Sequence, residues 1–254
     1  MTTNIQTYFT DKSWIEGNAL QQLERTATLP GMVRVAGFPD LHPGKGGPVG
    51  AAMLSEGEFY PYLVGSDVGC GMALFDTDLD ATKAKPEKWA KKLRGLEKPW
   101  DGGTAAWLAE HEVVPDGFSS SSGTIGGGNH FAELLKVAEV LDESYFRFCG
   151  LKPDVLFLLV HSGSRGLGEK LLRSHVDVYR DGSLKSGSEE AVRYLVEHDN
   201  CLKWARANRH LIALRFLNQL DSSVGCSGDW SHNSISLTWS VSVWFRWWHV
   251  LPRS

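Results

Sequence analysis

The stretch Gly65-Ser66-Asp67-Val68-Gly69-Cys70-Gly71-Met72 places a carboxylate and a thiol three residues apart between glycines. The apolar run 62–64 before it predicts a buried strand, and the glycines let the backbone turn sharply or approach a ligand closely. A carboxylate and a thiolate this close repel each other unless a cation lies between them, and a bound metal keeps such a thiol deprotonated. The stretch is therefore a candidate metal site, although a lone cysteine is more often a small buried hydrophobic residue.

Composition limits the class of protein. With 254 residues, 42% of them hydrophobic and 22% charged, the chain can bury a substantial core as one large domain or two small ones. No apolar run is long enough to span a bilayer and residues 1–7 lack the features of a signal peptide, so we expect a cytoplasmic protein without a membrane partner. The four scattered cysteines argue against a disulfide framework. The net charge of -4 gives no global attraction to nucleic acid, but a local basic groove can still hold phosphates.

Hydrophobic periodicity predicts both helices and strands, and neither an internal repeat nor a clear linker is visible. Helices are expected over residues 14–27, 80–96 and 188–217, and strands over 32–36, 62–64 and 154–160. A loop is expected over 38–50, and a loop with at most a short helix over 100–122. The loop over 38–50 contains Lys45 among several glycines. Such a loop either cradles a phosphate with its backbone N–H groups or is an ordinary tight turn, and the pattern favours neither.

Two further segments carry candidate ligands. Three consecutive glycines precede Asn129, His130 and Glu133, and the i, i+3 spacing of the last two would place them on one face if the segment were helical. A single histidine is more often a core residue, but the glycines favour a functional role. The buried strand 154–160 ends on His161, which is followed by hydroxyls and Arg165. The planar guanidinium binds phosphate bidentately, so this segment combines a ligand with an anion clamp.

The last third of the chain offers two less specific pairs. Asn208 and Arg209 either face a cleft or lie on a solvated helix face, and His232 is followed by Asn233. A serine nucleophile is not favoured, because Ser162 and Ser164 do not lie in a Gly-x-Ser-x-Gly turn. None of the histidines has zinc-finger spacing, so spacing alone does not identify a metal.

Four ordered motifs together resemble the RtcB family of RNA ligases. They are Pro39-Asp40-Leu41-His42-Pro43-Gly44-Lys45-Gly46, Asp67-Val68-Gly69-Cys70-Gly71-Met72, Gly126-Gly127-Gly128-Asn129-His130-Phe131-Ala132-Glu133 and His161-Ser162-Gly163-Ser164-Arg165-Gly166. The segment Ala205-Arg206-Ala207-Asn208-Arg209 and the pair His232-Asn233 are similar as well, so the resemblance covers residues 31–233.

The resemblance implies a mixed α/β fold, with mixed β-sheets and surrounding helices about one metal-binding cleft. It implies a GTP- and manganese-dependent ligase for tRNA splicing or RNA repair, which joins 3′-phosphate or 2′,3′-cyclic phosphate ends to 5′-hydroxyl ends through a guanylylated histidine. We expect a monomer.

The resemblance also implies roles for individual residues. Cys70 would bridge two Mn²⁺ ions, with Asp67 and His130 on one ion and His161 and His232 on the other. Asn129 and Glu133 would contact the guanylate. We expect Lys45 and Arg165 to handle phosphates, with Arg165 and Cys70 taking part in catalysis. The residues alone would suggest zinc, and the resemblance changes the expectation to manganese.

The sequence departs from the family after residue 233. The later segment that carries the nucleophilic histidine is not found, and residues 234–254 form an atypical tail rich in tryptophan. We therefore expect an incomplete ligase domain over 1–233, a tail outside the native fold that exposes its aromatic side chains, and no completed ligation. Two alternatives stay open, an inactive metal-binding fragment and a metal-dependent phosphoesterase.

Overall fold

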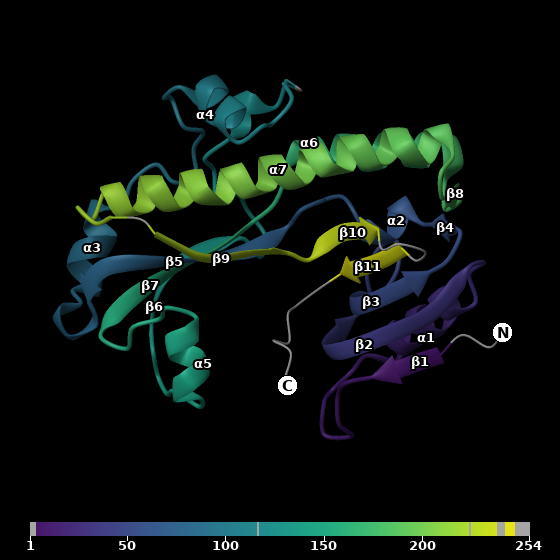
Figure 1. The fold of residues 1–254 in the computed structure, drawn as a ribbon, viewed down its shortest axis with the longest axis horizontal. Helices are drawn as coiled ribbons and strands as arrows, with labels where there is room; N and C mark the ends of the chain where they lie inside the picture. The colour runs from purple at the N-terminus through teal and green to yellow at the C-terminus, as the bar shows by residue number, and fades with distance from the viewer. Residues whose placement is uncertain (1–3, 116, 224, 238–241, 247–254) are drawn as a thin grey trace. The chain divides into compact units, whose positions relative to one another are not determined.

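A computed structural model describes residues 4–115, 117–223, 225–237 and 242–246 (Figure 1). The chain divides into two compact units. Unit 1 contains residues 1–69, 166–201 and 232–254, and unit 2 contains residues 70–165 and 202–231. The helices and sheets within each unit confirm the expected mixed α/β class.

Unit 1 is built on a five-stranded sheet in the order β1-β2-β3-β11-β10. Its strands are β1 (Asn4–Thr7), β2 (Met32–His42), β3 (Val49–Ser55), β10 (Asn233–Leu237) and β11 (Ser242–Arg246), and a small second sheet pairs β4 (Glu58–Phe59) with β8 (Leu184–Lys185). Its helices are α1 (Gly17–Ala27), α2 (Pro61–Val64) and α6 (Gly166–Tyr179). Helix α1 buries Ala19, Leu23 and Ala27, one apolar stripe at helical spacing.

Unit 2 is built on a four-stranded antiparallel sheet in the order β6-β7-β5-β9. The strands are β5 (Gly71–Asp80), β6 (Phe131–Lys136), β7 (Val155–Ser162) and β9 (Gly225–Ser231). Short helices lie between them: η1 (Ala81–Lys83), α3 (Pro86–Lys92), α4 (Thr104–Glu110), η2 (Ser119–Ser121) and α5 (Glu143–Phe148). The long helix α7 (Glu189–Asn218) contributes residues 189–201 to unit 1 and residues 202–218 to unit 2.

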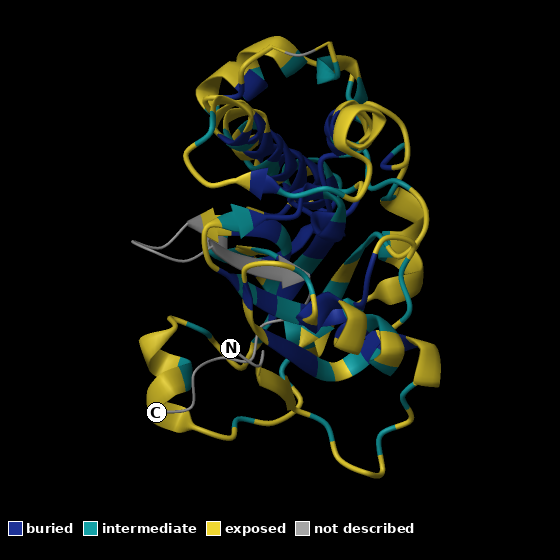
Figure 2. Ribbon diagram, turned by 90° about the vertical axis from the view of Figure 1, so that its right-hand side faces the viewer, coloured by how far each residue is buried: buried dark blue, intermediate teal, exposed yellow. Residues whose placement is uncertain are grey.

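The two faces of the unit 2 sheet have different environments. Because side chains alternate along a strand, Phe75 of β5 and Leu158 and Val160 of β7 share one face. They form a buried cluster with Ile212 and Leu217 of α7, so we call this side the α7 face (buried residues are dark blue in Figure 2). The opposite face carries the alternate residues, and His161 is one of them.

Several sequence-based expectations are confirmed. The helix expected over 188–217 is α7 and the strand over 154–160 is β7, whereas the described residues of 100–122 form loop with two short helices, α4 and η2, rather than at most one. The helix expected over 14–27 is shorter and begins at Gly17. The segments that form α1, α7 and β7 share strong periodicity or a long apolar run, which are the most reliable local signals.

Other expectations are wrong. Residues 62–64 belong to helix α2 rather than to a strand, since Pro61 at the first helical position favours a helix start. The helix expected over 80–96 is reduced to η1 and α3, because β5 continues to Asp80. The loop over 38–50 is reduced to 43–48 between β2 and β3.

Part of the tail forms strands in the described residues. β10 pairs with β11, and β11 pairs with β3. The run 242–246 is rich in β-formers, a signal that a search for amphipathic periodicity overlooks. Trp239, Trp247, Trp248 and His249 lie outside the described residues. That the tail stands apart from the native fold stays a prediction.

Among the described residues, no helix combines the length and the apolar character that a membrane crossing requires.

We predict that Gly71→Ala destabilises the fold by about 1–3 kcal/mol, because overpacking forces backbone shifts. A Cβ at Gly71 would lie 2.8 Å from the Cα of Ser231 and closer still to the carbonyl of Trp230. Urea unfolding measures the change. The control is Gly127→Ala, whose Cβ would meet nothing within 4 Å. Equal stabilities of the two variants would contradict the prediction.

Candidate metal centre

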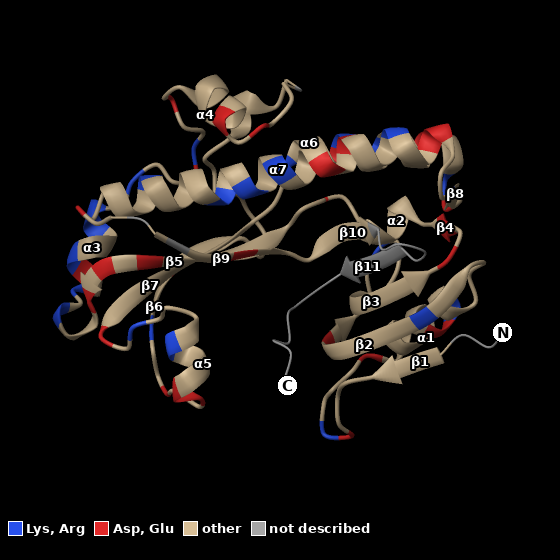
Figure 3. Ribbon diagram, viewed as in Figure 1, with Lys and Arg blue, Asp and Glu red and all other residues tan. Residues whose placement is uncertain are grey.

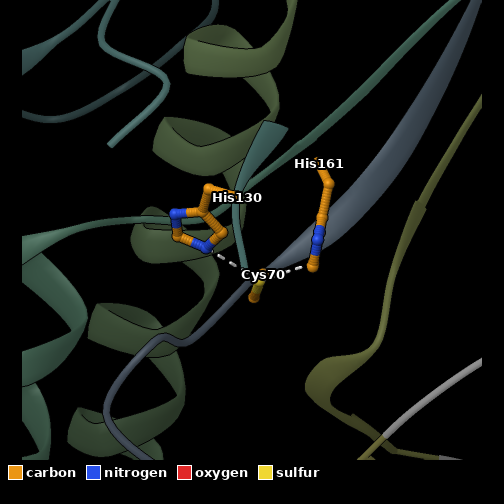
Figure 4. A group of neighbouring side chains, drawn as sticks. All are labelled: Cys70, His130 and His161. Atoms are coloured by element: carbon orange, nitrogen blue, oxygen red, sulfur yellow. Dashed lines mark hydrogen bonds between the residues drawn. The ribbon is translucent and has the colours of Figure 1, made fainter. Parts of the chain in front are cut away.

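Cys70, His130 and His161 converge within unit 2 (Figure 4). The Sγ of Cys70 lies 3.4 Å from Nε2 of His130 and 3.3 Å from Nε2 of His161. The three ligand atoms all lie within 4.8 Å of one another. The thiol and one imidazole are almost fully buried, with exposures of 4% for Cys70 and 1% for His161, whereas His130 is half-buried.

The sheet explains why these residues meet. Cys70 immediately precedes β5, His130 immediately precedes β6, and His161 is the penultimate residue of β7, the strand between the other two. Met72 and Phe131 are the register partners of His161 on either side. The three candidate ligands therefore lie at the same end of three neighbouring antiparallel strands.

Hydrogen-bond partners set the tautomers of the two histidines. Nδ1 of His161 lies 2.9 Å from the backbone carbonyl of Asn129, which only accepts, so Nδ1 carries the proton and Nε2 presents its lone pair to Cys70. Nδ1 of His130 lies 2.6 Å from Nη1 of Arg165, which only donates, so the proton of a neutral His130 is on Nε2. In this arrangement Arg165 donates to His130 and His130 donates to Cys70. Cys70 then donates to His161, which donates to the carbonyl of Asn129.

The glycine-rich loop makes room for this arrangement. Gly126 has a φ of 93°, in the left-handed region, and a Cβ there would overlap the guanidinium of Arg165. A side chain at this position would therefore be strained and would also displace the arginine.

One sulfur and two imidazole nitrogens suit a divalent transition-metal ion. A carbonyl that accepts from the distal ring nitrogen, as Asn129 does for His161, is the usual support for a metal-binding histidine. The donor set fits a metal. By itself it is most typical of zinc.

Two other predicted ligands lie in unit 1. The backbone carbonyl of Asp67 accepts a hydrogen bond of 3.2 Å from the side chain of Asn233, and the N–H of Gly69 donates to the carbonyl of Asn233 at 2.7 Å. His232 precedes Asn233 and is buried, with 8% exposure. The segments of Asp67 and His232 are therefore neighbours within this unit.

The residues predicted to bind nucleotide or phosphate have different settings. Lys45 is exposed in the loop 43–48 of unit 1. Asn129 contacts the cluster through its carbonyl. Glu133 is exposed on β6, where it shares the face of His161, so the helical premise for His130 and Glu133 is wrong. Arg165 contacts His130 directly.

Asn208 and Arg209 are buried in unit 2, where the sequence alone left open a cleft or a solvated helix face. Both have 0% exposure, which excludes the solvated helix face. The guanidinium of Arg209 bonds the carboxylate of Asp229 through Nε, at 3.1 and 3.2 Å, and through Nη2. Their spacing from Ala205 and Ile212 places them on the apolar stripe of α7, a signal that could have identified them.

Asp229 is buried and ionised. Burial alone would raise its pKa, but the hydrogen bond from His210 and the charge of Arg209 outweigh burial and lower the pKa below its ordinary value. The carboxylate therefore remains the counter-ion of the arginine at neutral pH.

Helix α3 of unit 2 contains several basic residues, which are drawn blue in Figure 3. The helix carries Lys88, Lys91 and Lys92 against Glu87, although Lys92 is paired with Asp221 at 2.7 Å. Local positive charge therefore exists on a chain whose net charge is -4.

Known proteins resemble this chain over most of its length. A family model described as tRNA-splicing ligase RtcB matches residues 22–104 and 110–242. RNA-splicing ligase RtcB2 of Escherichia coli is 47% identical over 235 residues, which cover 91% of this chain and 61% of the relative. The tRNA-splicing ligase RtcB of Archaeoglobus fulgidus is 26% identical over 280 residues, covering 85% of this chain and 58% of the relative.

The chain thus spans about three-fifths of the length of these curated relatives. Because the matched residues make up most of the chain and include Cys70, His130 and His161, the chain belongs to the RtcB family.

Proposed function

We propose that this chain carries the metal site of an RNA ligase that joins RNA 3′-phosphate or 2′,3′-cyclic phosphate ends to 5′-hydroxyl ends with GTP and Mn²⁺. Membership of the RtcB family and the names of its relatives support an RNA-splicing ligase. The observation that carries the proposal is the convergence of Cys70, His130 and His161 from separate segments onto one point. The cytoplasmic location and the monomeric state stay predictions.

The residues have distinct roles in this proposal. Cys70, His130 and His161 would hold metal, and Asp67 and His232 would supply further ligands of a two-ion site. Paired divalent ions neutralise phosphate charge and orient the attacking group. Asn129 and Glu133 contact the guanylate, and Lys45 and Arg165 contact phosphates. The donor set alone favours zinc, and we propose manganese because of the resemblance to the RtcB family.

The alternatives are an inactive metal-binding fragment and a phosphoesterase. The test incubates the purified chain with Mn²⁺, labelled GTP, and RNAs with a cyclic phosphate or 3′-phosphate end and a 5′-hydroxyl end, followed by denaturing gels. Joined RNA that requires both GTP and Mn²⁺ supports the ligase and contradicts the expectation that this chain completes no ligation. Opening of the cyclic phosphate without joining favours the phosphoesterase, and metal binding without either reaction favours the fragment.

We predict that Cys70→Ala abolishes tight binding of a divalent transition metal, because it removes the central ligand atom. Titration with Co²⁺ measures the affinity, and the sulfur-to-cobalt charge-transfer absorption identifies the thiolate ligand. Cys149→Ala, which removes an exposed free thiol, is the control and should bind as wild type does. A charge-transfer band that persists in Cys70→Ala would refute the assignment of this ligand.

We predict that Arg165→Met raises the affinity for metal and lowers the affinity for RNA. A metal on Nε2 of His130 requires the ring proton on Nδ1, where it would face the guanidinium of Arg165, so metal binding must displace this arginine. Removing Arg165 should therefore tighten Mn²⁺ binding, on the order of tenfold for one charge-assisted hydrogen bond. The displaced arginine is then available for phosphate, so the variant should bind 3′-phosphate RNA more weakly, with a shallower salt dependence.

Calorimetry with Mn²⁺ and RNA binding across a salt series give the two affinities. The control is Arg173→Met, which removes an exposed arginine paired with Glu169. If Arg165→Met weakened both metal and RNA binding, the displacement argument would be wrong. If RNA affinity and salt slope were unchanged, Arg165 would have no role in phosphate binding.

A further inference from the structure

Asn208 and Arg209 of α7 are buried polar residues with no role in the chemistry described so far. Burying a guanidinium and a carboxamide is costly unless their hydrogen bonds are satisfied. The hydrogen-bond partners of Asn208 and Arg209 therefore indicate what these two residues do in the fold.

Asn208 joins two segments of unit 2. Its Oδ1 accepts from the N–H of Gly123 at 2.7 Å, and its Nδ2 donates to the carbonyl of Thr124 at 3.3 Å, at the start of the loop that leads to His130. The same Nδ2 donates to the hydroxyl of Ser162 at 3.1 Å. That hydroxyl in turn donates to the carbonyl of Ile125 at 3.1 Å. The glycine-rich loop is thus fastened to the end of β7.

Arg209 joins two strand ends. Its Nη1 donates to the carbonyl of Ser162 at 2.9 Å, and its Nη2 reaches the hydroxyl of Ser231 at 3.4 Å. Its Nε and Nη2 also donate to the carboxylate of Asp229 of β9. Arg209 therefore holds the ends of β7 and β9 together.

Between these two strand ends lies Gly71 of β5. Ser162 and Ser231 are its register partners on the two sides, so the three residues form one row across the sheet. Cys70 is the neighbour of Gly71, and His161 is the neighbour of Ser162. Because side chains alternate, Ser162 points to the α7 face while His161 points to the opposite face.

We propose that Asn208 and Arg209 are positioning residues for the metal site: from the α7 face they hold the strand ends and the loop that carry Cys70, His130 and His161. The inference rests on the proposed function and extends it to residues that touch no ligand atom. Supports of this kind typically change metal affinity by about 10- to 100-fold when removed.

The test is Co²⁺ titration of the full chain, with thermal unfolding measured in parallel. We expect Asn208→Ala and Arg209→Met to weaken Co²⁺ binding by about 10- to 100-fold and to reduce the charge-transfer absorption, at temperatures where circular dichroism shows both variants folded. Arg209→Lys should restore part of the affinity, because the ammonium keeps a charge opposite Asp229 but cannot also reach Ser162.

The matched control is Leu217→Ala. Leu217 lies on the same helix and is fully buried in the core cluster of unit 2, but its apolar side chain makes no hydrogen bond to the loop or to the strand ends. We expect this variant to lower the melting temperature, because it leaves a cavity in the core, and to keep the wild-type affinity for Co²⁺. A loss of affinity equal to that of Arg209→Met would show that reduced stability alone loosens the site, and would overturn the inference.

If Arg209→Met does not fold, Asn208→Ala and Ser162→Ala decide, because each removes only neutral hydrogen bonds. Wild-type affinity and absorption in both would overturn the inference while leaving the proposed function intact. A wild-type chain that binds no Co²⁺, or a Cys70→Ala variant that binds it equally well, would instead overturn the proposed function and this inference with it.

Discussion

The buried ion pair between Arg209 and Asp229 links helix α7 to strand β9 of the unit 2 sheet. Removing one partner of such a pair leaves an uncompensated buried charge, at a typical cost of about 3–5 kcal/mol. The same guanidinium satisfies the backbone carbonyl of Ser162. Because the pKa of Asp229 is lowered in the folded state, its contribution to stability is present at neutral pH and is lost as the pH falls through that lowered pKa.

The two faces of one strand serve different purposes in β7. Leu158, Val160 and Ser162 face α7, where they provide apolar packing and a polar anchor. His161, on the other face, meets Cys70 and is supported by the carbonyl of Asn129. The stability of the core and the geometry of the candidate metal centre are therefore set by adjacent residues.

Local patterns predicted much of this architecture. The apolar run of β7 and the periodicity of α7 are strong signals, and the glycine-framed motifs alone identified Cys70, His130 and His161 as candidate ligands. The failures have physical causes: α2 is a single turn started by Pro61, and the strand that follows His130 had no alternating polar pattern. The roles of Asn208 and Asp229 depend on contacts between residues far apart in the sequence, which no local pattern contains.

The alternation along β7 restricts where the chain tolerates changes in length. Deleting or inserting one residue between Leu158 and His161 would reverse the faces, placing the imidazole in the apolar core and a core side chain beside the thiol. The segment 137–154 joins β6 to β7 and is mostly exposed, so a change in its length does not reverse the faces of a strand. Insertions and deletions among relatives should therefore concentrate in connectors of this kind, while the spacing from the core positions of β7 to its histidine stays fixed.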